Sequence, residues 1–187
     1  MRTLILYSST DGHTVKICQF LQKIIEQQED EATLISVEQE SGINLKDFDR
    51  VIIGASIRYG KHSPLIVDFI NNNTAMLNTL PNAFFSVNLV ARKPEKRTPE
   101  TNPYLNKFLK QISWKPMELA VFAGKLDYPR YKFRDRLMIR MIMWMTGGPT
   151  ERNAVVEFTD WKQVAAFGRL VSQMKRPPNG YNAAGLA

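Results

Sequence analysis

An apolar run at residues 4–7 ends abruptly in hydroxyl side chains and a glycine, and a helical pattern follows at once. Ser9, Thr10 and Thr14 bring hydroxyl donors to this junction, and Gly12 lets a ligand approach the backbone closely. A helix that begins there points its unpaired N–H groups and positive dipole end at the junction. The dinucleotide and nucleoside triphosphate fingerprints are absent. We therefore predict a monophosphate-binding loop, and the alternative is an ordinary strand-to-helix turn.

Strand and helix patterns alternate after this junction. Further strands are predicted at residues 33–37, 48–55, 82–88 and 118–124, and helices at 17–25, 64–70, 104–112 and 160–171. Such alternation predicts a parallel sheet with right-handed crossovers and helices on both faces. The arrangement resembles the flavodoxin fold, which implies a single α/β domain over residues 1–175 with strand order 2-1-3-4-5.

The alternation breaks between residues 125 and 155, which we interpret as an insertion after or within the fifth strand. Residues 155–158 are predicted to resume the edge of the sheet. Inside the insertion, residues 133–145 form a basic, Met-rich amphipathic segment. It fits a helix at the surface of an anionic membrane or a helix packed on the sheet, and the sequence leaves both open. Residues 176–187 lack apolar periodicity and are predicted to be a flexible tail.

The loop Ser9-Thr10-Asp11-Gly12-His13-Thr14 resembles the flavodoxin phosphate loop, which implies FMN as cofactor. Asp11 departs from that pattern, and its carboxylate must point away from a phosphate. Two further loops follow the third and fourth strands, where flavodoxin-like sheets hold the flavin ring, and we expect Tyr59 or the Arg58 stem to lie against one face of that ring. The predicted cofactor-binding residues are Ser9, Thr10, Asp11, Gly12, His13, Thr14, Ser56, Ile57, Arg58, Tyr59, Gly60, Val87, Asn88, Leu89, Val90 and Ala91.

Other kinds of site find little support in the sequence. His13 and His62 are the only histidines, and neither has a second ligand at metal-binding spacing, so no metal site is predicted. His62 could donate a proton near the flavin, but a loop histidine without a function is the favoured interpretation. Cys18 falls in the apolar stripe of the first helix, so we expect it to pack rather than react. No catalytic residue is identified.

The chain carries a net charge of +7, concentrated in two segments. Residues 92–110 and residues 125–140 each hold six basic against two acidic side chains. Local basicity indicates an anionic partner, and guanidinium groups suit carboxylates. The tentative carboxylate-binding residues are Arg58, Arg92, Lys93, Lys96 and Arg97, and the alternative is a solvated loop. Nucleic-acid binding would explain the charge but not the three loops, so it is not expected.

Three segments together resemble the family of bacterial flavodoxin-like protoporphyrinogen IX dehydrogenases that use quinone. They are the phosphate loop, residues 51–60, and above all the run Ser86-Val87-Asn88-Leu89-Val90-Ala91-Arg92-Lys93-Pro94-Glu95-Lys96-Arg97-Thr98-Pro99. The resemblance implies oxidation of protoporphyrinogen IX to protoporphyrin IX in haem biosynthesis, with menaquinone or ubiquinone as electron acceptor.

The same resemblance implies peripheral attachment to the cytoplasmic face of the inner membrane. The N-terminus enters a strand at once, so no signal peptide is expected. A flavodoxin-like electron carrier and an NAD(P)H:quinone reductase remain alternatives, and the number of subunits, including a homo-oligomer, stays open.

Overall fold

The main sheet of the protein consists of five parallel strands in the order β2-β1-β3-β4-β5. The structure is a computed structural model and describes residues 1–39 and 42–175, so the predicted tail at 176–187 lies outside the described residues. The strands are β1 (Arg2–Ser8), β2 (Glu31–Ser36), β3 (Arg50–Ser56), β4 (Asn82–Asn88) and β5 (Glu118–Ala123). The predicted flavodoxin-like topology is confirmed.

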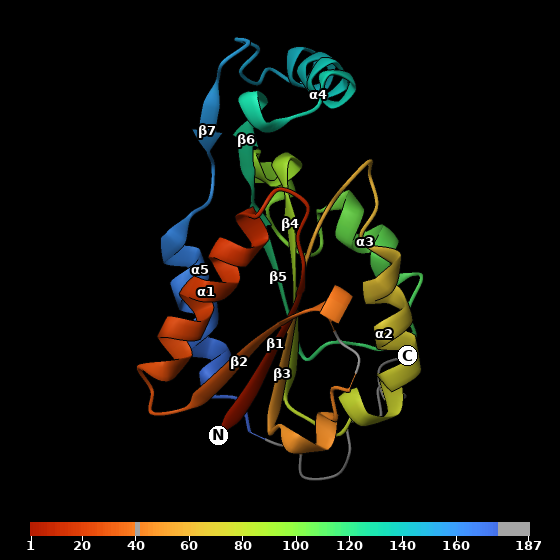
Figure 1. Cartoon of the computed structure of the whole chain (residues 1–187), viewed down its shortest axis with the longest axis vertical. Coiled ribbons are helices and arrows are strands. Elements are labelled where there is room, and N and C mark those ends of the chain that lie inside the picture. Colours follow the sequence, from red (N-terminus) through yellow and green to blue (C-terminus); the bar gives the residue numbers. More distant parts are fainter. Residues whose placement is uncertain (40–41, 176–187) are drawn as a thin grey trace.

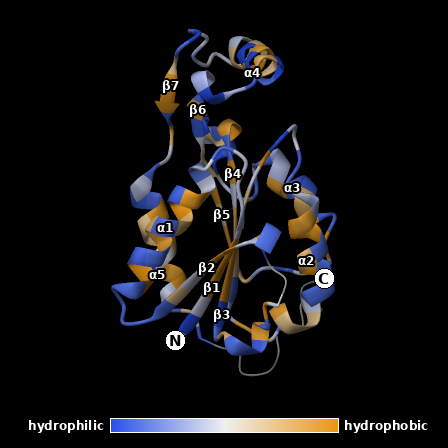
Figure 2. Ribbon diagram, in the orientation of Figure 1, coloured by the Kyte–Doolittle hydropathy of each residue, from blue (hydrophilic) through white to orange (hydrophobic). Residues whose placement is uncertain are grey.

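Helices cover both faces of this sheet (Figure 1). On one face lie α1 (His13–Glu26) and α5 (Trp161–Ser172), and on the other lie α2 (Pro64–Leu77) and α3 (Pro103–Leu109). Short 3₁₀ helices occupy Val37–Gln39, Leu45–Asp47, Leu89–Arg92, Pro94–Lys96 and Tyr128–Arg130. Because both faces are covered, the central strands β3 and β4 are almost wholly buried, and most of their residues are apolar (Figure 2). None of the described helices is long and apolar enough to span a membrane.

The insertion begins where β5 ends and leads into α5 at the same end of the sheet (Figure 1). It contains β6 (Lys125–Asp127), α4 (Phe133–Met145) and β7 (Val155–Glu157). The prediction that residues 155–158 resume the main sheet is wrong, because β7 pairs antiparallel with β6 in a separate ribbon. The physical reason is strand direction. A further parallel strand would have to start at the end of the sheet where the other strands start, which needs a crossover connection. The chain instead reverses direction beyond the end of β5, so β7 can pair only antiparallel with β6.

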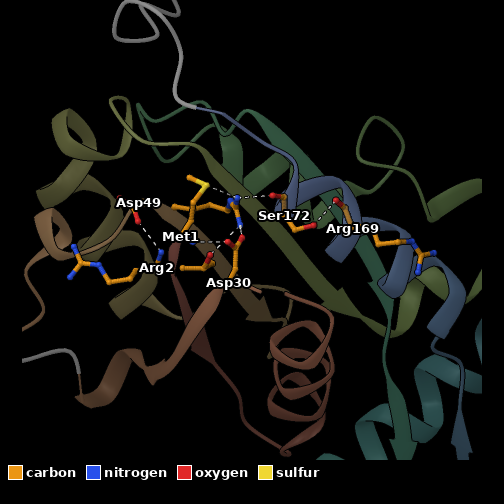
Figure 3. A network of polar contacts seen from close by, with 8 residues as sticks. Met1, Arg2, Asp30, Asp49, Arg169 and Ser172 are labelled. Carbon is orange, nitrogen blue, oxygen red and sulfur yellow. Dashed lines mark hydrogen bonds and ion pairs between the residues drawn. The ribbon is translucent and has the colours of Figure 1, made fainter. Parts of the chain in front are cut away.

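A charge network around a buried arginine stabilises the end of the sheet where the strands β1 and β3 begin (Figure 3). The guanidinium of Arg50 is fully buried and donates to Thr3 Oγ1 (3.2 Å), Asp30 Oδ2 (3.0 Å) and the Ser172 carbonyl (2.7 Å). Asp30 also accepts from the N-terminal ammonium of Met1 at 2.6 Å. A buried charge is stable only when it is paired. This network therefore connects β1, β3 and the end of α5 at the amino ends of the strands.

Candidate functional site

A cavity opens at the carboxyl ends of β1, β3 and β4, with α4 on its far side (Figure 1). Open α/β sheets bind ligands at this edge. The lining residues that the sequence predicted are Ser9, Thr10, Asp11, His13, Thr14, Ser56, Ile57, Arg58, Tyr59, Gly60, Val87, Asn88, Leu89 and Val90. The structure therefore brings all three predicted loops together around one cavity.

The loop after β1 presents an uncapped helix N-terminus to this cavity. Gly12 is the N-cap of α1, and no side chain caps it. The first N–H groups of a helix have no intrahelical partner, so those of α1 are available to a ligand. Gly12 adopts φ +81°, a left-handed conformation, and a Cβ there would meet nothing within 4 Å. The Gly12 amide itself donates to Ser9 Oγ at 3.1 Å, which holds the loop in this conformation. The open space and the amides of the first turn of α1 fit a phosphate group.

The carboxylate of Asp11 contacts a side chain of the neighbouring loop. Asp11 Oδ2 lies 3.4 Å from Nη1 of Arg58, which belongs to the loop after β3. Burial raises the pKa of Asp11 above its usual range, although Arg58 opposes this shift. The acidic residue thus links two loops of the cavity.

The loop after β3 is a tight two-residue turn. Arg58 and Lys61 exchange backbone hydrogen bonds of 2.9 and 3.0 Å, while Tyr59 and Gly60 between them both have positive φ. Positive φ is uncommon outside glycine and is found at functional sites. The turn leaves 64% of Tyr59 exposed at the cavity. An aromatic face held there suits a planar ring system.

The loop after β4 is organised by two buried amides. The Asn88 side chain accepts from the Ala91 amide at 3.1 Å, and Asn102 donates to Asn88 Oδ1 at 3.2 Å and to the Lys96 carbonyl at 2.8 Å. These bonds fix the loop so that Leu89 and Val90 line the cavity.

Two predicted cofactor-binding residues lie outside this lining. Ala91 is buried in the core on the α2 and α3 side, and Gly12 lines a small adjoining pocket with Lys16, Lys125 and Arg130.

The tentative carboxylate-binding residues are divided by the structure. Arg58 and Arg92 line the cavity, whereas Lys93, Lys96 and Arg97 do not. The Arg58 guanidinium pairs with Asp11 and Asp135. That of Arg92 donates to the carbonyls of Leu89 and Thr146. Both cavity arginines are thus engaged within the protein, which leaves the three loop cations as carboxylate-binding candidates.

The two histidines have structural surroundings. His62 is buried against Phe84 and Phe108, with Nε2 2.9 Å from Ser86 Oγ, and it is not part of the cavity lining. Burial lowers the pKa of His62 to about 4, so the ring is neutral at physiological pH. His13 Nε2 lies 2.6 Å from Thr159 Oγ1, and this hydroxyl donates to the Ala123 carbonyl. His13 therefore donates through Nε2 and anchors the phosphate loop.

No metal site or reactive thiol accompanies the cavity. Within residues 1–39 and 42–175, no group of three or more His, Cys, Asp or Glu side chains is arranged to hold a metal ion. Cys18 is fully buried, and burial raises the pKa of its thiol far above the usual range. It packs in the core, as predicted.

Sequence reasoning missed the contribution of the insertion to the cavity. Nine lining residues were not predicted, and five of them lie on one face of α4. They are Asp135, Met138, Ile139, Ile142 and Met143 on α4, and Tyr104, Gly124, Lys125 and Tyr131 elsewhere. The spacing of the α4 residues is that of a helix face. The sequence contains this pattern, but the same helix also has a second apolar face, so the pattern does not indicate which face lines the cavity.

Comparison with known proteins agrees with this geometry. A family model described as a flavodoxin domain matches residues 4–153. The protoporphyrinogen IX dehydrogenase (quinone) of Escherichia coli K12 is 46% identical over 178 residues, covering 95% of this chain and 98% of that protein. The protein of the same name from Leishmania major is 41% identical, covering 89% of this chain and 72% of its own length.

A solved structure shares the fold. The crystal structure of oxidised flavodoxin 1 from Bacillus cereus superposes with a TM-score of 0.51 at 14% identity, covering 91% of this chain and 97% of that one. FMN is the cofactor of the flavodoxin domain, and the open phosphate loop and the two ring-side loops fit it. The chain therefore belongs to the flavodoxin domain family and, within it, to the family of the protoporphyrinogen IX dehydrogenases (quinone).

Proposed function

We propose that this protein uses FMN to oxidise protoporphyrinogen IX to protoporphyrin IX in haem biosynthesis, with menaquinone or ubiquinone as electron acceptor. The observation that carries the proposal is the 46% identity to the Escherichia coli protein of that name across nearly all of both chains. The convergence of three loops on one cavity supports it independently.

Each element of the cavity has a distinct part in this reaction. When bound, FMN would supply two-electron transfer between the porphyrinogen and quinone. The amides and hydroxyls of residues 9–14 would hold its phosphate, and the Tyr59 turn and Leu89–Val90 would border its ring. Met138, Ile142 and Met143 give the cavity an apolar wall that excludes water and suits a hydrophobic substrate. Lys93, Lys96 and Arg97, on the loop after β4, are suited to the substrate's propionates.

A flavodoxin-like carrier or an NAD(P)H:quinone reductase would use the same FMN site. The relatives favour the dehydrogenase over these two alternatives. The Escherichia coli and Leishmania major proteins are both named as this dehydrogenase, and each is similar to this chain over most of its length.

An anaerobic assay separates these functions. The FMN-loaded protein is mixed with protoporphyrinogen IX and either a menaquinone or a ubiquinone analogue. We expect porphyrin fluorescence to rise only with quinone present, in a fixed ratio to quinone reduced. NADPH in place of the porphyrinogen is the control and should reduce the flavin poorly. Rapid reduction by NADPH without porphyrin formation would instead identify a quinone reductase.

We further propose that α4 attaches the protein peripherally to anionic lipid at the cytoplasmic face of the inner membrane. Its outward face exposes five large apolar side chains, of which Phe133 is 79% and Trp144 is 75% exposed. The others are Leu137, Met141 and Met145. The same helix carries Arg134, Arg136 and Arg140, and aromatic and basic residues together suit the lipid headgroup region. The helix lies beyond the strand ends rather than on a face of the sheet (Figure 1), which favours this hypothesis over packing on the sheet.

Vesicle binding tests the attachment. Wild-type protein is expected to sediment with vesicles of phosphatidylglycerol and phosphatidylcholine, and poorly with phosphatidylcholine alone. The double variant Phe133→Ser/Trp144→Ser should bind the anionic vesicles at least about tenfold more weakly, because two large apolar side chains are lost from the interface. Leu170→Ser, which alters an exposed apolar residue of α5, is the matched control. Equal sedimentation of all three proteins would refute the attachment.

A further inference from the structure

We propose that Asp135 of α4 is a positioning residue for the flavin site, because its buried carboxylate fixes the two side chains of the β3 turn that border the cavity. The inference rests on the proposed function in that the cavity holds FMN. It assigns the insertion a part in flavin binding that is separate from any contact with lipid.

The carboxylate of Asp135 is fully engaged. Oδ2 accepts from Nη2 of Arg58, and Oδ1 accepts from the Tyr59 hydroxyl at 2.5 Å. Asp135 is only 6% exposed, although it lies on a helix whose other side faces solvent. A carboxylate removed from water is stable only with such charge-assisted partners. These two bonds therefore hold the first turn of α4 against the β3 turn.

Arg58 extends the connection to the phosphate loop. Its guanidinium contacts Asp11 as well as Asp135, and it lies 5.1 Å from the centre of the Tyr59 ring. A second basic side chain, Arg130, donates to the Asp11 carbonyl at 3.4 Å. One cation thus joins the phosphate loop, the β3 turn and α4, so a change at Asp135 reaches both ends of the cofactor site.

The other end of α4 is tied down separately. Arg92 donates to the carbonyl of Thr146 at 3.1 Å and to its hydroxyl, just after the helix ends. Because α4 does not lie on a face of the sheet, these polar contacts at its two ends help to keep it over the cavity (Figure 1). Loss of Asp135 releases only the end that touches Tyr59.

The position of Tyr59 explains why it needs this anchor. Its backbone is in the left-handed region and its ring is mostly exposed, so the protein core does not restrain it. A side chain that must be ordered when a ligand binds weakens binding, and one ordered beforehand does not. The hydrogen bond to Asp135 orders the Tyr59 ring before any ligand arrives.

Four variants test the inference: Asp135→Ala, Asp135→Asn, Tyr59→Phe and the double variant Asp135→Ala/Tyr59→Phe. FMN affinity is measured by flavin fluorescence, together with the visible circular dichroism of the bound flavin and its midpoint potential. Asp135→Ala removes both charge-assisted hydrogen bonds that order the β3 turn, so it should weaken FMN binding at least about tenfold. It should also raise the midpoint potential, because a negative charge that opposes added electrons is removed.

The remaining variants separate positioning from general stability. Asp135→Asn keeps one acceptor oxygen and should be intermediate. The double variant should be little worse than Asp135→Ala, because the hydrogen bond that Tyr59→Phe removes is already lost in Asp135→Ala. Glu151→Gln, which neutralises an exposed acid of the insertion, is the control and should bind FMN normally. If Asp135→Ala lowers only the thermal stability of the apoprotein and leaves flavin affinity, dichroism and potential unchanged, the inference is wrong. Wild-type protein that binds FMN without oxidising protoporphyrinogen would overturn the proposed function alone.

Discussion

Replacement of Gly12 by valine is expected to lower the affinity for FMN at least about 100-fold, the loss of about two charge-assisted hydrogen bonds. Gly12 has φ +81°, which a β-branched residue adopts only with strain of about 1–2 kcal/mol. Relief of that strain turns the peptide and moves the amides of the loop away from the phosphate. The valine side chain also enters the open space beside the loop.

Gly42 provides the matched control for this variant. It too has positive φ, and a Cβ there would also meet nothing within 4 Å, but it lies between β2 and β3 and lines neither the cavity nor the adjoining pocket that contains Gly12. Gly42→Val should show similar backbone strain in thermal unfolding while it retains FMN. Normal FMN binding by Gly12→Val, or equal loss in both variants, would show that the loop does not bind the phosphate.

The sequence predicts those residues of the site that directly follow a strand of the main sheet. An apolar run such as residues 51–55 identifies a central strand, and a parallel sheet brings the residues after each strand to the same edge. The positions of Ser9, Tyr59 and Leu89 at one cavity follow from that rule alone. The conformations within the loops do not, since the positive φ of Tyr59 and the bonds of Asn88 arise from tertiary contacts.

The insertion was the part that sequence predicted least well. Its returning segment was assigned to the main sheet because a short β-branched run looks the same in a ribbon and at a sheet edge. The helix α4 is apolar on two sides, so its periodicity could not show which side meets the cavity. Likewise, the sequence predicts Arg58 and Arg92 as carboxylate-binding residues. It cannot show that Arg58 forms an ion pair with Asp135 or that Arg92 donates to the Thr146 carbonyl, because these partners are far away in the chain.

We expect the phosphate to contribute more to the free energy of FMN binding than any other part of the cofactor. A phosphate at the start of α1 meets several backbone donors and the positive end of the helix dipole, and each charge-assisted hydrogen bond contributes about 1.5–3 kcal/mol. Riboflavin presents the same ring to Tyr59 and the loop after β4 but has no phosphate. We therefore expect riboflavin to bind at least about 100-fold more weakly than FMN.

Titration of the apoprotein with FMN and with riboflavin, followed by flavin fluorescence under the same conditions, tests the central claim most directly. We expect tight binding of FMN and a preference over riboflavin of at least about 100-fold, which falls sharply in Gly12→Val. Equal affinity for the two flavins, or no binding of FMN, would contradict it.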